Sequence, residues 1–187
     1  DYVNFRRSIG LAWMEEELVD MCSQLLSQFE RLHAINIYHR DIKPENIVLR
    51  FKDLNIRYIF VDFGLASYEK KTTGIWPVGG TQGYMAPEIW KLMEANVGAG
   101  EFDLYEADIY SIGVSMLYVI FNTVPAYAEI KDYLVKCKTQ YPKVAEMLEK
   151  IILDRKCPPN LDLDYSFIPK ISWPCDPKPF TVRPSKE

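Results

Sequence analysis

Four side chains that can do chemistry lie close together in the sequence: Asp41, Lys43, Asn46 and, sixteen positions after Asn46, Asp62. Carboxylate and amide oxygens are the hard ligands that Mg²⁺ prefers. A carboxylate can also accept a proton, and a lysine can neutralise negative charge. Side chains of these types could therefore bind a metal ion, accept a proton or neutralise negative charge.

These residues belong to an ordered series of motifs. The series runs His39-Arg40-Asp41-Ile42-Lys43-Pro44-Glu45-Asn46, then Asp62-Phe63-Gly64, then Ala86-Pro87-Glu88 after a polar, glycine-rich stretch. It resembles the protein kinase family, whose signatures are a catalytic loop of H-R-D-x-K-x-x-N type, D-F-G and A-P-E. About nine specified residues in the correct order and spacing exclude a chance match.

The resemblance implies a protein Ser/Thr kinase that transfers the γ-phosphoryl group of ATP to a Ser or Thr hydroxyl of a protein substrate, with Mg²⁺. It assigns Mg²⁺ binding to Asn46 and Asp62, and acceptance of the hydroxyl proton to Asp41. Lys43 matches the lysine that contacts the γ-phosphate and that marks Ser/Thr kinases within the family. A transferring phosphoryl group spreads negative charge over its oxygens, so these residues would act by positioning and by charge neutralisation.

The same resemblance gives Arg40 and two threonines a regulatory role. Arg40 would pair with a phosphate on the activation loop, for which Thr72 and Thr73 are the candidates. A phosphate beside an arginine can order a loop through charge-assisted hydrogen bonds. His39 is expected to be a packing residue.

The segment 80–88 resembles the substrate-docking segment of Ser/Thr kinases. Thr81 would hydrogen-bond near Asp41 and Lys43. Residues around Tyr84 would shape the pocket that follows the target hydroxyl.

Two acidic residues are expected to be structural. Asp108 opens an apolar helix and would cap backbone N–H groups of the catalytic loop, because a charged residue at such a place needs partners. Glu88 matches a glutamate that pairs with an arginine late in the family's sequence. Arg183 and Arg155 are both candidates, and we favour Arg183, although more residues separate it from Pro177 than the family usually has.

Apolar spacing and turn residues predict the elements around these motifs. Steps of three and four from Leu18 to Leu32 predict one helix, and 109–121 is an apolar stretch too short to span a bilayer, as in a buried core helix. The full set of expected elements is helices over 13–33, 87–94, 105–121, 131–138 and 143–152, strands at 47–49 and 56–61 that form a hairpin, and loops over 35–46, 65–83 and 96–102. The proline-rich tail from Cys157 is expected to be irregular.

The small lobe of the family carries a G-x-G-x-x-G loop, a lysine on its third strand and a glutamate on its C helix. The sequence contains no counterpart of these features. We therefore expect a mainly α fold, a kinase-like C-terminal (large) lobe with small β-hairpins around the catalytic loop and no N-terminal lobe. Residues 1–187 would form one partial protein kinase domain with no second domain, weak or inactive alone.

Composition limits the partners and the compartment. The 187 residues are 48% hydrophobic and 26% charged, with a net charge of −4 and no basic stripe, so neither nucleic acid nor a membrane surface is expected as a partner. The four cysteines are far apart and form no C-x-x-C pair, which favours free thiols. With no signal peptide, this favours an intracellular protein, cytoplasmic or nuclear.

Two functions follow from these observations. One is an active Ser/Thr kinase of which this chain is a fragment, favoured by the complete set Asp41, Lys43, Asn46 and Asp62. The other is a catalytically incompetent kinase-like lobe that acts as a protein-binding module, favoured by the missing small-lobe features.

Overall fold

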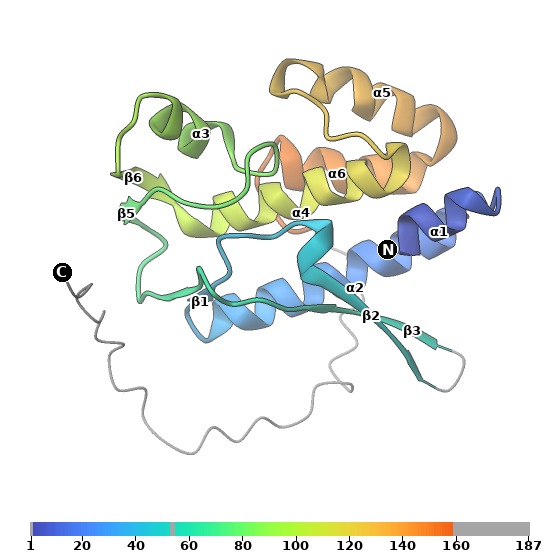
Figure 1. Cartoon of the computed structure of the whole chain (residues 1–187), viewed down its shortest axis with the longest axis horizontal. Coiled ribbons are helices and arrows are strands. Elements are labelled where there is room, and N and C mark those ends of the chain that lie inside the picture. The colour runs from blue at the N-terminus through green and yellow to red at the C-terminus, as the bar shows by residue number, and fades with distance from the viewer. Residues whose placement is uncertain (1, 53–54, 159–187) are drawn as a thin grey trace.

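The computed structural model describes residues 2–52 and 55–158 (Figure 1). In chain order its elements are α1 (Tyr2–Ser8), α2 (Glu15–Ala34), β1 (Ile37–Tyr38), the 3₁₀ turn η1 (Pro44–Asn46), β2 (Ile47–Lys52), β3 (Asn55–Phe60), β4 (Ser67–Tyr68), β5 (Thr73–Pro77), α3 (Pro87–Glu94), β6 (Ala99–Asp103), α4 (Leu104–Phe121), the 3₁₀ turn η2 (Tyr127–Glu129), α5 (Ile130–Gln140) and α6 (Pro142–Ile152). The described part is therefore mostly helical, with small two-stranded sheets. The proline-rich tail lies outside the described residues, apart from Cys157 and Pro158.

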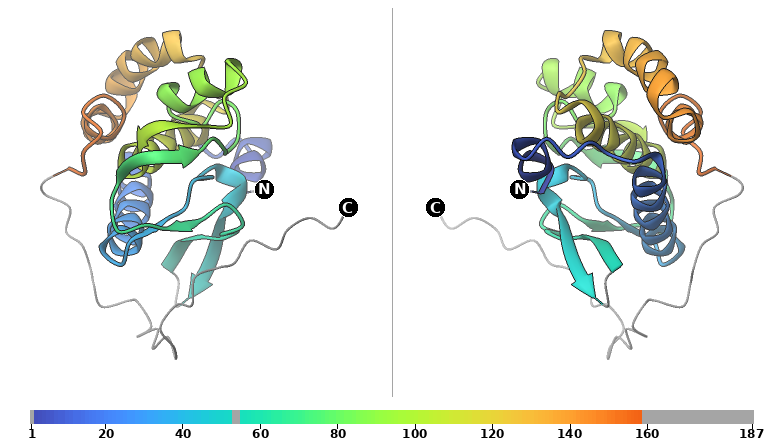
Figure 2. Two further views of the ribbon diagram at one scale, coloured as in Figure 1. Left: turned by 90° about the vertical axis from the view of Figure 1, so that its left-hand side faces the viewer. Right: turned by 90° about the vertical axis from the view of Figure 1, so that its right-hand side faces the viewer.

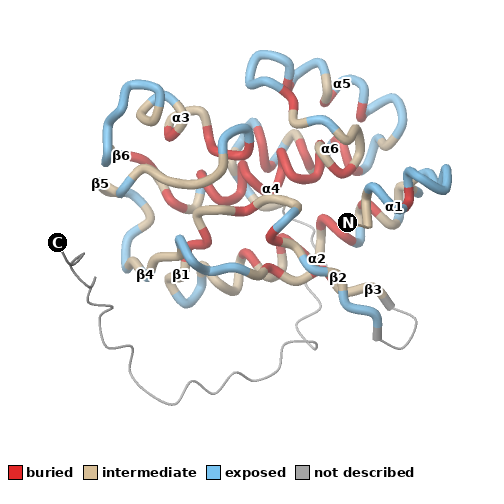
Figure 3. Tube along the Cα trace, viewed as in Figure 1, coloured by how far each residue is buried: buried red, intermediate tan, exposed pale blue. Residues whose placement is uncertain are grey.

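Helix α4 runs through the middle of the described part, between α2 and α6 (Figure 1). It is apolar on nearly all sides, and Ile109, Ile112 and Met116 are fully buried, which explains why most of it is red in Figure 3. Within the described residues it is also the one helix long and apolar enough to cross a membrane. Most of it is buried among the other elements, as in the core helix of a globular fold.

Helix α2 shows the predicted apolar stripe. Leu18, Cys22, Leu25 and Phe29 are buried, with Phe29 leaving 1% of its surface exposed and the other three none. Three glutamates occupy the first turn, where negative charge is favourable at the positive end of the helix dipole.

The polar side of α2 holds the hairpin of β2 and β3. The Gln24 side chain donates to the carbonyl of Ile56 (3.1 Å) and accepts from the amide of Tyr58 (3.2 Å). Gln28 donates to the carbonyl of Tyr58. These amide side chains cover the edge of the hairpin that would otherwise present unpaired backbone groups. Figure 2 shows the hairpin on the side of the molecule away from α5.

Three antiparallel pairs make up the sheets: β2 with β3, β1 with β4, and β5 with β6. The first confirms the predicted hairpin. The second corrects the predicted loop over 35–46, where Ile37 pairs with Tyr68. The third corrects the prediction of loops over 65–83 and 96–102, since Thr73 pairs with Asp103 and Pro77 with Ala99. Glycines and lysines in the first stretch obscured β-forming residues such as Ile75 and Trp76.

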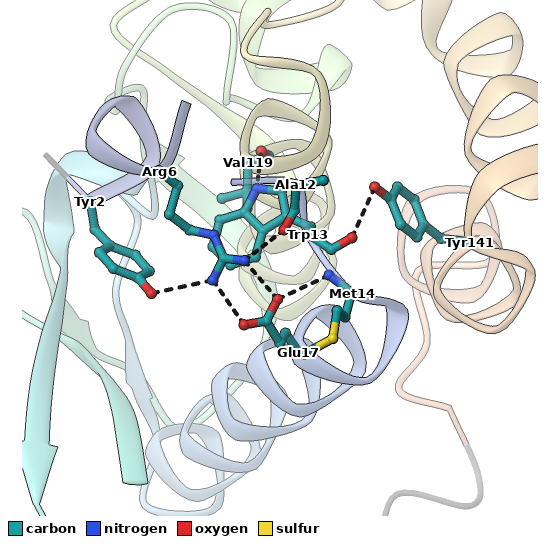
Figure 4. A network of polar contacts seen from close by, with 8 residues as sticks. All are labelled: Tyr2, Arg6, Ala12, Trp13, Met14, Glu17, Val119 and Tyr141. Carbon is teal, nitrogen blue, oxygen red and sulfur yellow. Dashed lines mark hydrogen bonds and ion pairs between the residues drawn. The ribbon is translucent and has the colours of Figure 1, made fainter. Parts of the chain in front are cut away.

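Helix α1 was not predicted, and one buried arginine ties it to α2 (Figure 4). Arg6 has 3% of its surface exposed and pairs with both carboxylate oxygens of Glu17 at 2.8 Å. It also donates to the carbonyl of Ala12 (2.7 Å), and its guanidinium lies 4.0 Å from the ring centroid of Trp13. Glu17 in turn accepts from the amide of Met14 and so caps α2.

Candidate active site

The loop between β1 and β2 gathers three of the predicted catalytic residues. Asp41 Oδ1 accepts from the hydroxyl of Thr81 at 2.6 Å, and Lys43 Nζ lies 3.0 Å from Asp41 Oδ2. Lys43 also donates to Thr81 Oγ1 at 2.7 Å. Asn46 donates to the Asp41 carbonyl (2.9 Å) and to its Oδ2 (3.2 Å). The structure thus brings Asp41, Lys43, Asn46 and Thr81 into one hydrogen-bonded group.

These contacts set the charge of Asp41. Burial acts to raise the pKa of its carboxyl, but hydrogen bonds from Thr81 and Lys43 outweigh that effect and leave the pKa below its ordinary value. Asp41 is therefore a carboxylate near neutral pH, the form that can accept a hydrogen bond from a hydroxyl.

Asp108 holds the backbone just before Asp41. Its Oδ2 accepts from the amide of His39 (2.7 Å) and its Oδ1 from the amide of Arg40 (2.8 Å). Its own surface is 2% exposed, so these bonds offset the cost of burying a carboxylate at the start of α4.

Asp108 has a third partner that the motifs did not predict. His33 Nε2 lies 3.2 Å from Asp108 Oδ2, and the His33 ring packs between Phe29 and Tyr38. The sequence feature that could have indicated this role of His33 is its position, as a polar residue at the end of an apolar helical stripe and next to the catalytic loop.

Asp62 follows β3 and is tied to the catalytic loop through its neighbour Val61. The amide of Val61 donates to the carbonyl of Asn46 (2.9 Å), and His39 Nε2 lies 3.0 Å from the Val61 carbonyl. His39 also packs against the ring of Phe63, with 4.8 Å between the ring centroids. Asp62 itself is exposed, and its Oδ1 accepts from the amide of Gly64 at 3.2 Å.

The oxygen atoms of this region suit Mg²⁺. Asn46 turns its amide nitrogen towards Asp41, which leaves its amide oxygen for a cation. The exposed Asp62 carboxylate adds two hard oxygens. In the part of the chain that the structure describes, no group of three or more His, Cys, Asp or Glu residues could hold a metal ion. Asn46 and Asp62 would therefore supply only part of the oxygen ligands of a cation, and water or a bound phosphate would supply the rest.

Arg40 does not meet the two candidate phosphothreonines. Its guanidinium donates to the backbone carbonyls of Leu65 (3.4 Å) and Pro77 (2.5 Å). Burial lowers the pKa of Arg40, and Asp108 opposes that shift. Thr72 and Thr73 instead donate to the carboxylate of Asp103, a residue that the sequence analysis did not single out.

The segment 80–88 closes over the catalytic loop. Gly80 has a φ of 122°, and a Cβ on it would lie 2.9 Å from the carbonyl oxygen of Arg40, so only glycine lets Thr81 approach Asp41 in this way. Tyr84 is 6% exposed and packs against Tyr118 on α4, so its side chain supports the segment from beneath. Burial raises the pKa of the Tyr84 hydroxyl.

Glu88 is paired with Arg155. Their closest atoms, Arg155 Nη2 and Glu88 Oε2, are 3.5 Å apart, and Arg155 also donates to the carbonyl of Glu106 (3.0 Å). The guanidinium lies 4.1 Å from the ring centroid of Tyr110. These contacts favour the alternative, Arg155, over our preference for Arg183, which lies outside the described residues.

Comparison with known proteins agrees with the motifs. The protein kinase domain family matches residues 4–181. Three similar proteins are serine/threonine-protein kinase cds1 of Schizosaccharomyces pombe (33% identical, 80% of this chain and 31% of its own length), CBL-interacting serine/threonine-protein kinase 20 of Arabidopsis thaliana (32%, 80% and 34%) and myosin light chain kinase A of Dictyostelium discoideum (29%, 71% and 43%).

The chain belongs to the protein kinase family, because the match covers nearly all of its residues. Its relatives include Ser/Thr protein kinases at about one-third identity. The chain spans less than half the length of each of these three relatives.

Proposed function

We propose that this chain is the C-terminal lobe of a protein Ser/Thr kinase and that its catalytic loop transfers the γ-phosphoryl group of ATP to a Ser or Thr hydroxyl. The observation that carries the proposal is the environment of Asp41. Its two carboxylate oxygens are held by Thr81, Lys43 and Asn46, which fix the carboxylate in one place and keep it ionised. The family match and the Ser/Thr kinase relatives support the same reaction.

Asp41 would orient the hydroxyl of the substrate and accept its proton. A base must come within about 2.6–3.2 Å of the atom whose proton it takes, and such a residue contributes about 10²–10⁴-fold to a rate. Because Asp41 already accepts several hydrogen bonds, it is held in place before the substrate arrives.

Lys43 and Thr81 would hold the transferring phosphoryl group and the substrate hydroxyl close to each other. The lysine ammonium has three N–H donors. Its contacts with Asp41 and Thr81 leave at least one donor for the transferring phosphoryl group. Thr81 links the docking segment to the base, so a substrate bound along 80–88 would place its hydroxyl near Asp41.

Asn46 and Asp62 would hold Mg²⁺ through the oxygens described above. When bound, the cation supplies positive charge that neutralises the phosphate oxygens. A backbone hydrogen bond places these two residues relative to each other. The amide of Val61, the residue just before Asp62, donates to the carbonyl of Asn46.

The test is phosphoryl transfer by the native protein that contains this chain, isolated from its own cells and supplied with Mg²⁺ and ATP labelled on the γ-phosphate. Label should appear on Ser or Thr of a mixed peptide substrate. Asp62→Asn should lower the rate by about 10²-fold or more, whereas Asp132→Asn, an exposed site on α5, should not change it. Unchanged transfer by Asp62→Asn would refute the role given to Asp62. A folded wild-type protein without transfer would favour a protein-binding module.

A further inference from the structure

The activation segment is fastened to the start of α4 by a β-ladder. Strand β5 pairs with β6 from Thr73–Asp103 to Pro77–Ala99. Backbone bonds continue the pairing beyond both ends, from Val78 to the Gly98 carbonyl and from Leu104 to the Thr72 carbonyl. In Figure 1 the paired strands lie beside α3, at the end where α4 begins. The segment between D-F-G and A-P-E therefore contains ordered structure of its own.

One carboxylate closes the end of this ladder. Asp103 Oδ2 accepts from the hydroxyls of Thr72 (2.6 Å) and Thr73 (2.8 Å), while Oδ1 accepts from the amide of Glu106 (3.0 Å) and so caps α4. Burial acts to raise the pKa of Asp103, but the bonds from Thr72 and Glu106 leave it below its ordinary value. We call the group Asp103, Thr72 and Thr73 the Asp103 latch.

Trp76 strengthens the same junction. Its indole N–H is shared between the carbonyls of Thr72 (3.2 Å) and Phe102 (3.1 Å), one on each side of the ladder. The ring lies so close to Gly74 that a Cβ there would approach it to 2.7 Å. A glycine at 74 is therefore needed for the indole to reach both strands.

The latch acts on the part of the segment that touches the catalytic loop. The ladder ends at Pro77, whose carbonyl accepts from Arg40, and Thr81 follows four positions later at Asp41. Arg40 thus donates to neutral carbonyl groups of the segment itself. The latch and Arg40 together hold the segment with no phosphate.

We propose that the Asp103 latch holds the activation segment in place without phosphorylation and that a phosphoryl group on Thr72 or Thr73 releases it. A phosphate carries about −1.5 to −2 charges near neutral pH. At either threonine it would replace a hydroxyl donor with an anion beside the Asp103 carboxylate, which disrupts by like-charge repulsion. The consequence is opposite to the ordering that a phosphate beside Arg40 would give.

The modification itself is ordinary group transfer from a nucleoside triphosphate. The threonine Oγ1 forms a bond to the γ-phosphorus of ATP, the bond from that phosphorus to the β,γ-bridging oxygen breaks, and ADP leaves. The hydroxyl proton goes to a base or to water. Thr73 is exposed to a modifying enzyme, and Thr72 is half-buried.

Hydrogen exchange of the backbone amides of 73–76 and 78, measured by mass spectrometry on the full 187-residue chain, tests the latch without any catalysis. Asp103→Asn removes the acceptor for both threonines but keeps an oxygen to cap α4, so that the helix survives. The exchange of these amides should become faster by about tenfold. The double variant Thr72→Val with Thr73→Val should give the same acceleration. Exchange at the wild-type rate in both would overturn the latch.

The effect of an anion is tested by Thr73→Glu against its neutral match Thr73→Gln. The glutamate variant should exchange faster than the glutamine variant, and adding Asp103→Asn should abolish the difference between them, because the repulsion needs both charges. Equal exchange in the two variants, or a slower rate in the glutamate variant, would overturn the release by phosphate.

Only the effect of the latch on catalysis rests on the proposed function. Loss of exchange protection is measured separately from phosphoryl transfer, so either can fail without the other.

Discussion

The Oδ1 atom of Asp108 accepts a 2.8 Å hydrogen bond from the backbone amide of Arg40, the residue that immediately precedes Asp41. Arg40 has a φ of 67°, in the left-handed region. A non-glycine residue in a sparsely populated backbone region costs about 1–3 kcal/mol and persists only where its surroundings fix it. The carboxylate on the buried helix α4 is therefore what fixes the backbone that presents Asp41.

Asp108→Ala should lower the free energy of unfolding by about 3 kcal/mol, because it leaves the amides of His39 and Arg40 without their acceptor. Asp108→Asn should cost less, since its amide keeps one acceptor oxygen. Urea denaturation of the two variants beside the wild type measures both values. An alanine variant as stable as the wild type would contradict the role of Asp108.

Arg155 should contribute to stability through several contacts at once. Arg155→Ala removes the ion pair with Glu88, the bond to the Glu106 carbonyl and the stacking on Tyr110, and should cost about 1–2 kcal/mol. Arg155→Lys keeps the positive charge but loses the several N–H donors and the planar stacking of the guanidinium. It should recover less than half of the lost stability. If Arg183→Ala destabilised the chain in urea and Arg155→Ala did not, our original preference for Arg183 would stand.

The ion pair between Arg6 and Glu17 should make stability depend on pH. Burial acts to raise the pKa of Glu17, but the Arg6 bonds dominate and lower it. A lowered pKa contributes stability that is present above the unfolded value of about 4.3 and is lost as the pH falls through the folded value. Glu17→Gln should therefore lower the free energy of unfolding by about 2 kcal/mol at pH 7 and by progressively less below about pH 4.3. Thermal unfolding across pH measures this.

The matched control for that experiment is Glu16→Gln, an exposed neighbour in the same helical turn. It removes the same charge near the start of α2 but has no part in the Arg6 contact. Equal losses of stability in both variants at pH 7 would show that the effect comes from the helix dipole and not from the ion pair between Arg6 and Glu17.

Thr81 should matter to the reaction through its hydroxyl. Thr81→Val removes the donor to Asp41 and the acceptor for Lys43, and the rate of phosphoryl transfer by the native protein should fall by about tenfold or more. Thr81→Ser keeps both and should stay close to the wild-type rate. Initial rates at saturating ATP show the difference. A valine variant as fast as the serine variant would remove Thr81 from the site.

The helices from α2 onwards and the β2–β3 hairpin were predictable because their patterns are local, whereas α1 was not predicted. The stripe from Leu18 to Phe29 and the continuous apolar run of α4 are each visible within one segment. The ladder of β5 with β6 was not predictable, because its strands are short and lie on either side of α3. A pairing between distant short segments leaves almost no local pattern.

The parts of the candidate site that lie within the recognised motifs were predictable. The parts that depend on contacts between distant segments were not. Asp41, Lys43 and Asn46 share one loop, and the docking-segment resemblance supplied Thr81. Asp103 was missed, because its threonine partners lie 30 and 31 positions earlier in the sequence. Arg155 was ranked second for a similar reason, since the fold alone brings it to Glu88.

The most direct test of the central claim is the rate of phosphoryl transfer by the native protein carrying Asp41→Asn. This variant keeps the size of the side chain and replaces one carboxylate oxygen by a donor. With ATP bound as in the wild type, the rate should fall by about 10²–10⁴-fold. Transfer at the wild-type rate would contradict the role of Asp41, and with it the proposal that this loop performs the chemistry.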